Sequence, residues 1–207
     1  MSLPAYALTT LARVKNRAGI PDATTDFDTV LERLITIATN LIESNCQGRR
    51  FLTGTHTSEV HDAEPGQTVF YLNHWPVTSL TTVQFNAGTP GTPSWSTELA
   101  DNYALRENGD LGRVRMYSGY VGINALRFTY VAGYKIDWTH ETDESLHNLP
   151  FEISDLCERL ALAKFNKRTD EGKASQASQE NSITWDKMTL SESDLDLLRP
   201  YQRPRLA

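Results

Sequence analysis

Residues 27–47 read FDTVLERLITIATNLIESNCQ, and this stretch decides the helical half of the fold. Its apolar residues recur every three or four positions, a spacing that places them along one face of an α-helix. Gly48 follows, where a helix commonly ends. The stretch therefore predicts a long helix with one wide apolar face, formed by Phe27, Val30, Leu31, Leu34, Ile37, Ala38, Leu41 and Ile42.

The same periodicity predicts shorter helices on both sides of this stretch. One covers about residues 9–18. Another follows Pro150, which a helix tolerates in its first turn, and runs to about residue 168. A short helix near residues 192–198 begins after Ser191, a residue type that favours the N-cap position.

Between these helices the composition changes to that of a β structure. Thr, Val, Tyr and Phe become frequent, and Gly, Pro and Asn interrupt them. The clearest strand carries Leu126, Phe128 and Tyr130 on one side and Arg127 on the other, because side chains alternate along a strand. The predicted strands are Thr55–His61, Thr68–Leu72, Ser79–Phe85, Tyr103–Glu107, Arg113–Tyr117 and Ala125–Val131.

Two connections within this β region are also predicted. Asn108-Gly109-Asp110 is typical of a hairpin turn. The Gly- and Pro-rich segment 86–96 is predicted to be an exposed loop.

Helices segregated from strands favour an α+β fold with a mainly antiparallel sheet. We expect a helical bundle body at 1–168 with an inserted antiparallel β-rich block at about 52–132. Residues 169–207 form an extended C-terminal arm, because 169–182 lack large apolar residues and cannot offset their ordering entropy.

Composition excludes several classes of function. The chain has 207 residues, with 20 basic against 26 acidic side chains and a formal net charge of -6. Coating of nucleic acid is disfavoured, because such binding depends on neutralising phosphates. The apolar stretches are too short to span a membrane, and the first residues do not resemble a signal peptide. Cys46 and Cys157 fall on apolar helix faces and are predicted to be buried, reduced thiols.

The sequence contains no motif that predicts catalysis, a cofactor or a metal site. His56 and His61 share a predicted strand, but an offset of five places them on opposite faces, so they cannot chelate one ion from that strand. His140 and Asp143 lie in an acidic loop whose spacing matches no metal template. A catalytic site assembled from distant residues stays an alternative, and a solvated loop is the preferred interpretation.

The C-terminal arm carries the candidate binding residues. A short apolar cluster beyond a polar linker cannot form its own core and is expected to dock on a partner. The terminal arginines can contact phosphate or a carboxylate of a partner protein, and the acidic balance of the chain favours the protein. A frayed tail is the alternative. The predicted partner-binding residues are Ile183, Trp185, Met188, Leu198, Arg199, Tyr201, Arg203 and Arg205.

The order of these features resembles a family of phage proteins. Four stretches carry the resemblance: LTTLARVK at 8–15 with Gly19, IESNCQGRRF at 42–51 followed by WPVTSL at 75–80, FTYVAGY at 128–134 leading to the helix that ends FNKR at 165–168, and LLRPYQR at 197–203. In this order they resemble the head–tail connector, or adaptor, proteins of long-tailed phages, a family also labelled putative DNA packaging.

This resemblance implies a structural role in the virion, without enzymatic activity. Such proteins form a homo-oligomeric ring, commonly a dodecamer, that docks under the portal protein at the head–tail junction after assembly in the host cytoplasm. The ring extends the DNA channel and offers an attachment surface for a neck or tail-completion protein, and genomic DNA passes through it without sequence-specific binding. The arm would lie against the portal or a neighbouring subunit.

Two other functions remain alternatives. A DNA-binding packaging accessory factor would require a basic stripe, for which the C-terminal arginines are the candidate. A small hydrolase would require a site assembled from His140, Asp143 and distant residues.

Overall fold

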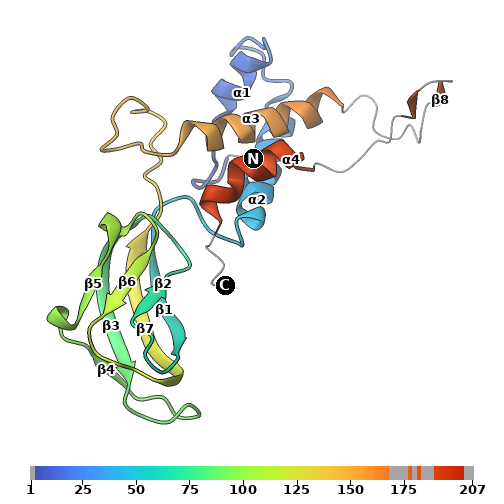
Figure 1. Cartoon of the computed structure of the whole chain (residues 1–207). Coiled ribbons are helices and arrows are strands. Elements are labelled where there is room, and N and C mark those ends of the chain that lie inside the picture. The colour runs from blue at the N-terminus through green and yellow to red at the C-terminus, as the bar shows by residue number, and fades with distance from the viewer. Residues whose placement is uncertain (1–2, 168–176, 179–180, 183–188, 203–207) are drawn as a thin grey trace. The chain divides into compact units, whose positions relative to one another are not determined.

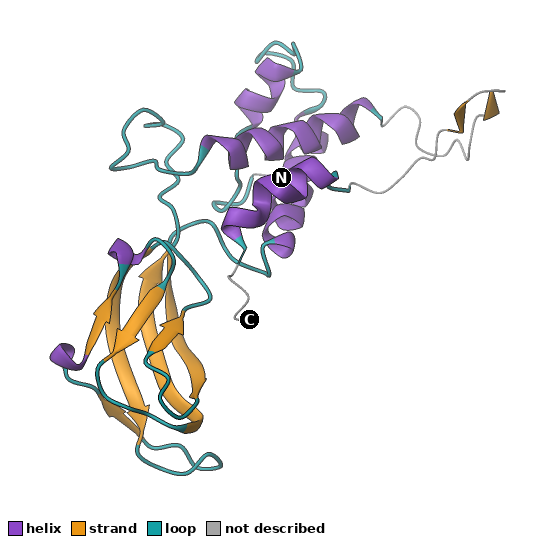
Figure 2. Ribbon diagram, viewed as in Figure 1, coloured by secondary structure: helices purple, strands orange, loops and turns teal. Residues whose placement is uncertain are grey.

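The computed structural model describes residues 3–167, 177–178, 181–182 and 189–202. It divides into two compact units. The helical unit contains Met1–Arg49 and Ile136–Ala207, and the β unit is Arg50–Lys135. Figure 1 shows the order of the elements along the chain, and Figure 2 shows the long helices in one unit and the long strands in the other, where two short helical turns accompany the strands. The predicted α+β class is confirmed.

The described part of the helical unit has four α-helices: α1 (Leu11–Arg17), α2 (Asp28–Asn45), α3 (Phe151–Asn166) and α4 (Glu192–Leu198), the last continuing into a 3-10 turn, η4 (Arg199–Tyr201). The long predicted helix is confirmed as α2. Its buried face packs against α3, and the rings of Phe27 and Phe165 meet edge to face at 5.5 Å. The α3 side of this core is Ile153, Leu156, Cys157, Leu160, Ala161 and Phe165.

The β unit is built from two antiparallel sheets. The four-stranded sheet has the order β1 (Gly54–Ala63), β7 (Gly122–Ala132), β3 (Val77–Asn86), β4 (Trp95–Thr97). The three-stranded sheet has the order β2 (Val69–Tyr71), β6 (Arg113–Met116), β5 (Tyr103–Leu105). Two short 3-10 turns, η1 (Ala100–Asn102) and η2 (Glu107–Gly109), flank β5, and a small pair, β8 (Ala177–Ser178) and β9 (Asn181–Ser182), lies outside the unit.

Apolar residues of both sheets share one core. Phe70 of β2 and Phe128 of β7 have ring centroids 6.1 Å apart, which joins the three-stranded to the four-stranded sheet. The alternation predicted for β7 is confirmed, because Leu126, Phe128 and Tyr130 are fully buried. Arg127 points the other way, where it donates to Gln84 and lies over the ring of Trp95.

Within the β unit, one strand was not predicted. β4 begins at Trp95, inside the segment assigned to an exposed loop, and pairs with the end of β3. Only the first part of that segment forms the loop, tied together by the side-chain amide oxygen of Asn86, which accepts from the backbone of Gly88 and Ser94. The hairpin expected at Asn108–Asp110 is confirmed, because β5 and β6 pair antiparallel across η2.

The placement of His56 and His61 on opposite faces is wrong. The pairing of β1 with β7 shifts between His56 and Glu59, where Ser58 adopts a positive φ of 60°. This bulge adds one residue and reverses the alternation. His56 therefore lies opposite Tyr130 and His61 opposite Leu126, both on the core side of the sheet.

Candidate interaction surfaces

The end of the described chain is seated on its own helical unit. Leu198 is fully buried, and Arg49, also buried, donates from Nη1 to the carbonyl oxygen of Tyr201 at 3.0 Å. The hydroxyl of Tyr201 donates to Glu152 at 2.7 Å, and the side chain of Gln202 donates to the carbonyl of Asn45 at 3.1 Å. The chain is thus held against α2 and α3 as far as residue 202.

A capping box and an ion pair fix the start of α4. Ser191 accepts from the backbone N–H of Asp194, and the Asp194 carboxylate accepts from the backbone N–H of Ser191. The second carboxylate oxygen of Asp194 is 3.0 Å from Nη2 of Arg159 on α3. The pKa of Asp194 lies below its ordinary value, because these hydrogen bonds and the arginine outweigh the effect of partial burial.

The eight predicted partner-binding residues have different positions. Ile183, Trp185, Met188, Arg203 and Arg205 lie outside the described residues. Leu198 belongs to the core of the helical unit, Tyr201 is half-buried against it, and Arg199 is exposed beside Asp196. Partner binding by this group stays a prediction.

A buried carboxylate joins α1 to α3. Glu158 accepts from Nε of Arg13 at 2.7 Å, from the hydroxyl of Thr9 at 3.1 Å and from Arg17 at 3.3 Å. Arg17 also pairs with Asp155 at 2.5 Å. Sequence reasoning missed this network, although the i, i+4 spacing of Arg13 and Arg17 places both cations on one side of a helix.

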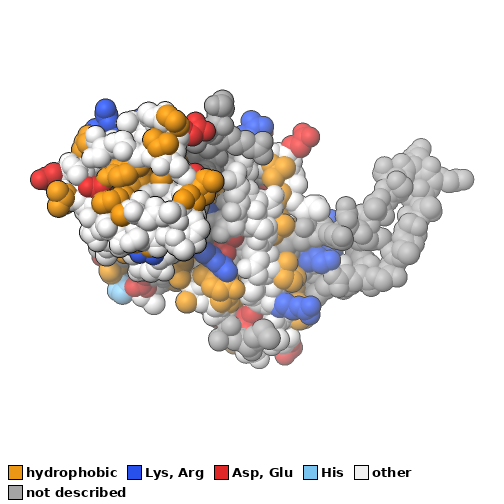
Figure 3. All heavy atoms as spheres, turned by 90° about the horizontal axis from the view of Figure 1, so that it is seen from below, with side chains coloured by type: hydrophobic (Ala, Val, Ile, Leu, Met, Phe, Trp, Pro, Cys, Tyr) orange, Lys and Arg blue, Asp and Glu red, His pale blue; other side chains and the backbone are white. Residues whose placement is uncertain are grey.

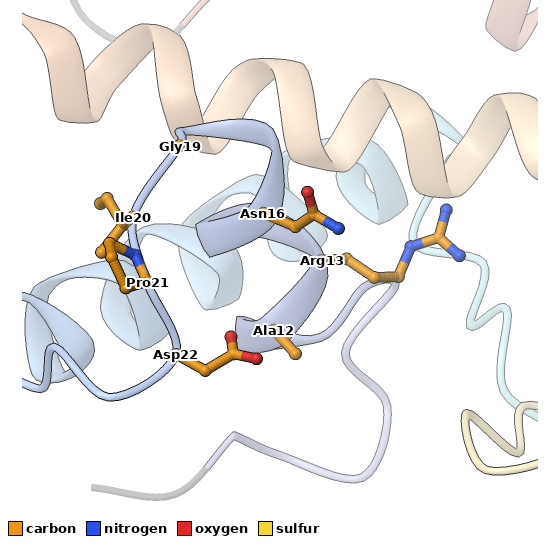
Figure 4. A pocket seen from close by; sticks show the side chains of 7 residues that line it. All are labelled: Ala12, Arg13, Asn16, Gly19, Ile20, Pro21 and Asp22. Atoms are coloured by element: carbon orange, nitrogen blue, oxygen red, sulfur yellow. The ribbon is translucent and has the colours of Figure 1, made fainter.

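A pocket of about 460 Å³ lies beside α1, between that helix and the turn that follows it (Figure 4). Its two charged lining residues are Arg13, which already pairs with Glu158 and Glu141, and Asp22. The other lining residues are Ala12, Asn16, Gly19, Ile20 and Pro21. This lining contains no nucleophile next to a base, so the pocket offers no catalytic arrangement.

Apolar side chains are exposed on both units. The apolar face predicted for α2 is wrong for Val30 and Ile37, which are exposed, whereas Leu31, Leu34, Ala38 and Ile42 are buried as expected. The two exposed residues lie seven positions apart and therefore on the same side of the helix. In the β unit, Val121 and Ile123 are 64% and 61% exposed, at the end where β7 begins. Figure 3, which views the molecule from below relative to Figure 1, shows hydrophobic side chains gathered on the β unit. Exposed apolar residues mark a contact surface where they form a contiguous patch, whereas single ones are common on any protein surface.

The acidic loop does not form the site that the hydrolase alternative requires. His140 Nδ1 faces Asp137 at 3.0 Å and the Thr139 hydroxyl at 2.8 Å, whereas Asp143 accepts from Ser145. A base that activates a nucleophile uses one ring nitrogen for the acid and the other for the nucleophile. Hydrogen bonds from Thr139 and His140 hold the pKa of the exposed Asp137 at about 2, as in a turn that caps its own backbone.

The described residues contain no cluster of three His, Cys, Asp or Glu side chains that could hold a metal ion. Cys46 and Cys157 are free and buried, as predicted. Burial raises the pKa of Cys46 to about 11 and that of Cys157 to about 12, so both stay protonated thiols at neutral pH. Within the described ranges, no helix is both long enough and apolar enough to cross a bilayer.

Comparison with known proteins gives matches among solved structures alone. No family model matches the sequence, and no curated protein matches it. A chain from a structure described as the neck of an empty GTA particle, computed with C6 symmetry, is 12% identical with a TM-score of 0.60, over 100% of this chain and 95% of that one. A chain from the virion of a native gene transfer agent (GTA) particle is 15% identical, with a TM-score of 0.59 over 100% and 95% of the two chains.

A third similar chain comes from the neck of a native GTA particle computed with C12 symmetry. It is 13% identical with a TM-score of 0.58, over 100% of this chain and 94% of that one. At these identities the likeness establishes a shared fold along the whole length of the chain.

Proposed function

We propose that this chain is a non-enzymatic structural subunit of the neck that joins the head of a tailed-phage-like particle to its tail. The observation that carries the proposal is the shared fold, over the full chain, with chains from particle necks computed with C12 and C6 symmetry. A symmetric neck is built from identical subunits that use one surface to meet a different surface of the next copy. The subunit would therefore be a component of the virion, at the head–tail junction.

The finer assignment is a ring adaptor under the portal protein. Its subunits, commonly twelve, would assemble in the host cytoplasm, extend the DNA channel and receive a neck or tail-completion protein on the far side. The exposed apolar residues of α2 and of the β unit offer unfilled contact area for such neighbours. The arginines and aromatic residues of the C-terminal arm are residue types that anchor protein interfaces.

The test is co-sedimentation of the purified chain with portal particles, followed by electron microscopy of the complex. Full-length protein is expected to add a ring below the portal. A chain shortened by 203–207 and carrying Trp185→Ala is expected to lose this association. This variant leaves the buried Leu198 and its seat unchanged, so the helical unit stays folded. Asp196→Ala, an exposed change in α4, is the control and is expected to bind normally.

Failure of the full-length chain to join the portal in any buffer that preserves its fold would reject the adaptor role. Binding of the shortened variant with normal affinity would reject the role of the arm, and the proposal of a ring under the portal would still stand.

A further inference from the structure

Three arginines lie together on the outer face of the three-stranded sheet. Val114 and Met116 of β6 are buried in the core, so Arg113 and Arg115, which alternate with them, point to the other side. Arg106 joins them from the end of β5, because its backbone N–H donates to the carbonyl of Arg113 at 2.8 Å. We call Arg106, Arg113 and Arg115 the arginine face.

This face is hollowed and carries a local positive charge. A cavity of about 520 Å³ is lined by Thr68, Val69, Glu107 and the three arginines. The lining therefore holds three positive charges against one negative charge, in a chain with a formal net charge of -6. Glu107 pairs with Nη1 of Arg113 at 3.0 Å and leaves the other two guanidinium groups uncompensated by a carboxylate in the lining.

Contacts to Tyr117 hold two of the guanidinium groups in place. Arg106 donates from Nη2 to the Tyr117 hydroxyl at 3.3 Å, and the Arg115 guanidinium lies 5.9 Å from the centroid of the same ring. Nε of Arg113 is buried and has no hydrogen-bond partner among the described residues. A planar guanidinium group that is already oriented, with donors still unused, is suited to bind phosphate oxygens.

We infer that the arginine face binds the phosphate backbone of double-stranded DNA, without reading its sequence. The choice of DNA as the polyanion rests on the proposed function, in which DNA passes through the ring. The chemistry of the lining agrees with it, because charged donors dominate and Val69 is the one apolar side chain. An acidic protein segment would be expected to need a central apolar or aromatic anchor in the cavity.

One subunit offers few phosphate contacts, so its own affinity for DNA is low. In a ring, several copies of the arginine face contact one duplex. Once one copy is bound, the others are held at a high effective concentration near the same DNA, so the ring binds more tightly than one subunit does. The acidic balance of the chain then keeps the remaining surface from adhering to DNA, and weak contacts still allow the duplex to slide.

The test uses the full chain labelled with nitrogen-15 and titrated with a short duplex at low salt. Shifts are expected for the amides of β5, β6 and Tyr117 and for the side-chain Nε signals of the three arginines. The logarithm of the binding constant is expected to fall with the logarithm of salt concentration with a slope of about -2.7 for three phosphate contacts.

Two double variants distinguish binding by the arginine face from an effect of the net charge of the chain. Arg113→Gln with Arg115→Gln is expected to lower the binding constant at least tenfold and to flatten the salt slope. Arg127→Gln with Arg50→Gln removes the same charge from other parts of the β unit and is expected to bind as the unchanged chain does. Thermal unfolding of both variants shows that each is folded.

Four results would overturn the inference: no shifts at millimolar duplex, shifts confined to residues 199–202, equal loss in both double variants, or binding of a glutamate-rich peptide in place of DNA. Full competition by millimolar inorganic phosphate would also overturn it in favour of a small-anion site. The Arg113→Gln, Arg115→Gln protein should still co-sediment with the portal. Absence of DNA binding by the unchanged chain, together with a normal ring on the portal, would reject this inference alone, whereas absence of a ring would reject the proposed function.

Discussion

Glu59 is a largely buried carboxylate at the bulge of β1, and three neighbours satisfy it. Its Oε1 accepts from the backbone N–H of Asn73 at 2.9 Å and faces His61 Nε2 at 2.7 Å, so that nitrogen carries the proton. Its Oε2 accepts from the hydroxyl of Tyr130 at 2.5 Å. The fully buried Tyr130 hydroxyl in turn accepts from the backbone of His74 at 3.2 Å.

Removal of the Tyr130 hydroxyl is expected to destabilise the β unit. Tyr130→Phe leaves one oxygen of Glu59 and the N–H of His74 without this partner, and an unsatisfied buried polar group costs about 1–3 kcal/mol. Urea unfolding would measure the loss. Tyr120→Phe is the control, because this half-buried ring stacks on Phe85 at 5.7 Å, and it should change stability by less than about 0.5 kcal/mol. Equal effects of the two changes would contradict the prediction.

The stabilisation by Glu59 is expected to depend on pH. Burial alone would raise the pKa of Glu59, but hydrogen bonds from His61 and Tyr130 and the charge of His61 lower it below its ordinary value of 4.5. A lowered folded-state pKa contributes stability above the unfolded value, and this contribution is lost as pH falls through the folded value. Glu59→Gln should therefore destabilise at pH 7 and have much less effect well below pH 4.5. The free energies of unfolding of the unchanged chain and of Glu59→Gln, measured at both pH values, test this prediction. A difference between the two proteins that does not change with pH would contradict it.

The same residues show what sequence could and could not predict at this scale. Burial of Leu126, Phe128 and Tyr130 followed from alternation alone, because through these positions the extra residues of the irregular pairings lie on β1 and β3 and not on β7. The sides of the sheet on which His56 and His61 lie could not be predicted from alternation, because Ser58 adopts a positive φ that no residue type nearby signals. A bulge moves every later side chain of the strand to the other face of the sheet. One extra residue that sequence did not reveal therefore brought Glu59 and His61 to the same side as His56.

At the scale of elements, α4 is short and its anchorage comes from packing. A helix of seven residues is not stable alone, so the buried Leu198 and the Arg159–Asp194 ion pair hold it on the helical unit. Sequence predicted this short helix from Ser191, which favours the N-cap position. It did not predict where the helix packs, because Asn45 is the last residue of α2 and Arg49 lies just beyond it, about 150 residues earlier in the chain.

Truncation of Leu198 is expected to release α4 locally. Leu198→Ala leaves a cavity at the only fully buried apolar side chain of this helix, which removes most of its packing. Because few contacts join α4 to α2 and α3, the effect should be local opening and not global unfolding. Hydrogen exchange should become faster over residues 192–202 while the centres of α2 and α3 keep their protection.

Leu195→Ala serves as the matched control, since Leu195 is on the same helix and exposed. It should leave exchange over residues 192–202 nearly unchanged. Unchanged exchange in Leu198→Ala, or loss of protection throughout the helical unit, would show that α4 is not an independently opening element.

The arginine face is an element-scale feature that sequence reasoning passed over. The spacing of Arg113 and Arg115 in a predicted strand indicated that both share a face. The addition of Arg106 depended on the register of the β5–β6 hairpin, and the hollow depended on η2 and β2 beside it. The unpredicted β4 has the same origin, because three residues pair with β3 through tertiary context and not through a strong local pattern.

At the scale of the whole molecule, the β unit starts and ends at one point. Phe51 stacks on Tyr134, the backbone N–H of Tyr134 donates to Phe51 at 2.6 Å, and the N–H of Thr53 donates to Tyr134 at 2.8 Å. Gly133 makes this approach possible, because its φ is +111° and a Cβ there would lie 2.7 Å from the carbonyl oxygen of Leu52. Two neighbouring segments thus close the unit around a core that is entirely its own.

We therefore expect residues 50–135 to fold as an isolated fragment. The residues of this core all belong to the β unit, and a core drawn from two sheets is sufficient for a domain of this size. The fragment should show dispersed amide signals and cooperative thermal unfolding. Gly133→Ala in the fragment should cost about 1 kcal/mol or more and lower Tm by about 4–8 °C, because it strains the closure of the ends. Gly91→Ala, which meets open space in the loop before β4, should change Tm little. A collapsed spectrum, or equal shifts from the two glycine changes, would mean that the β unit needs the helical unit in order to fold.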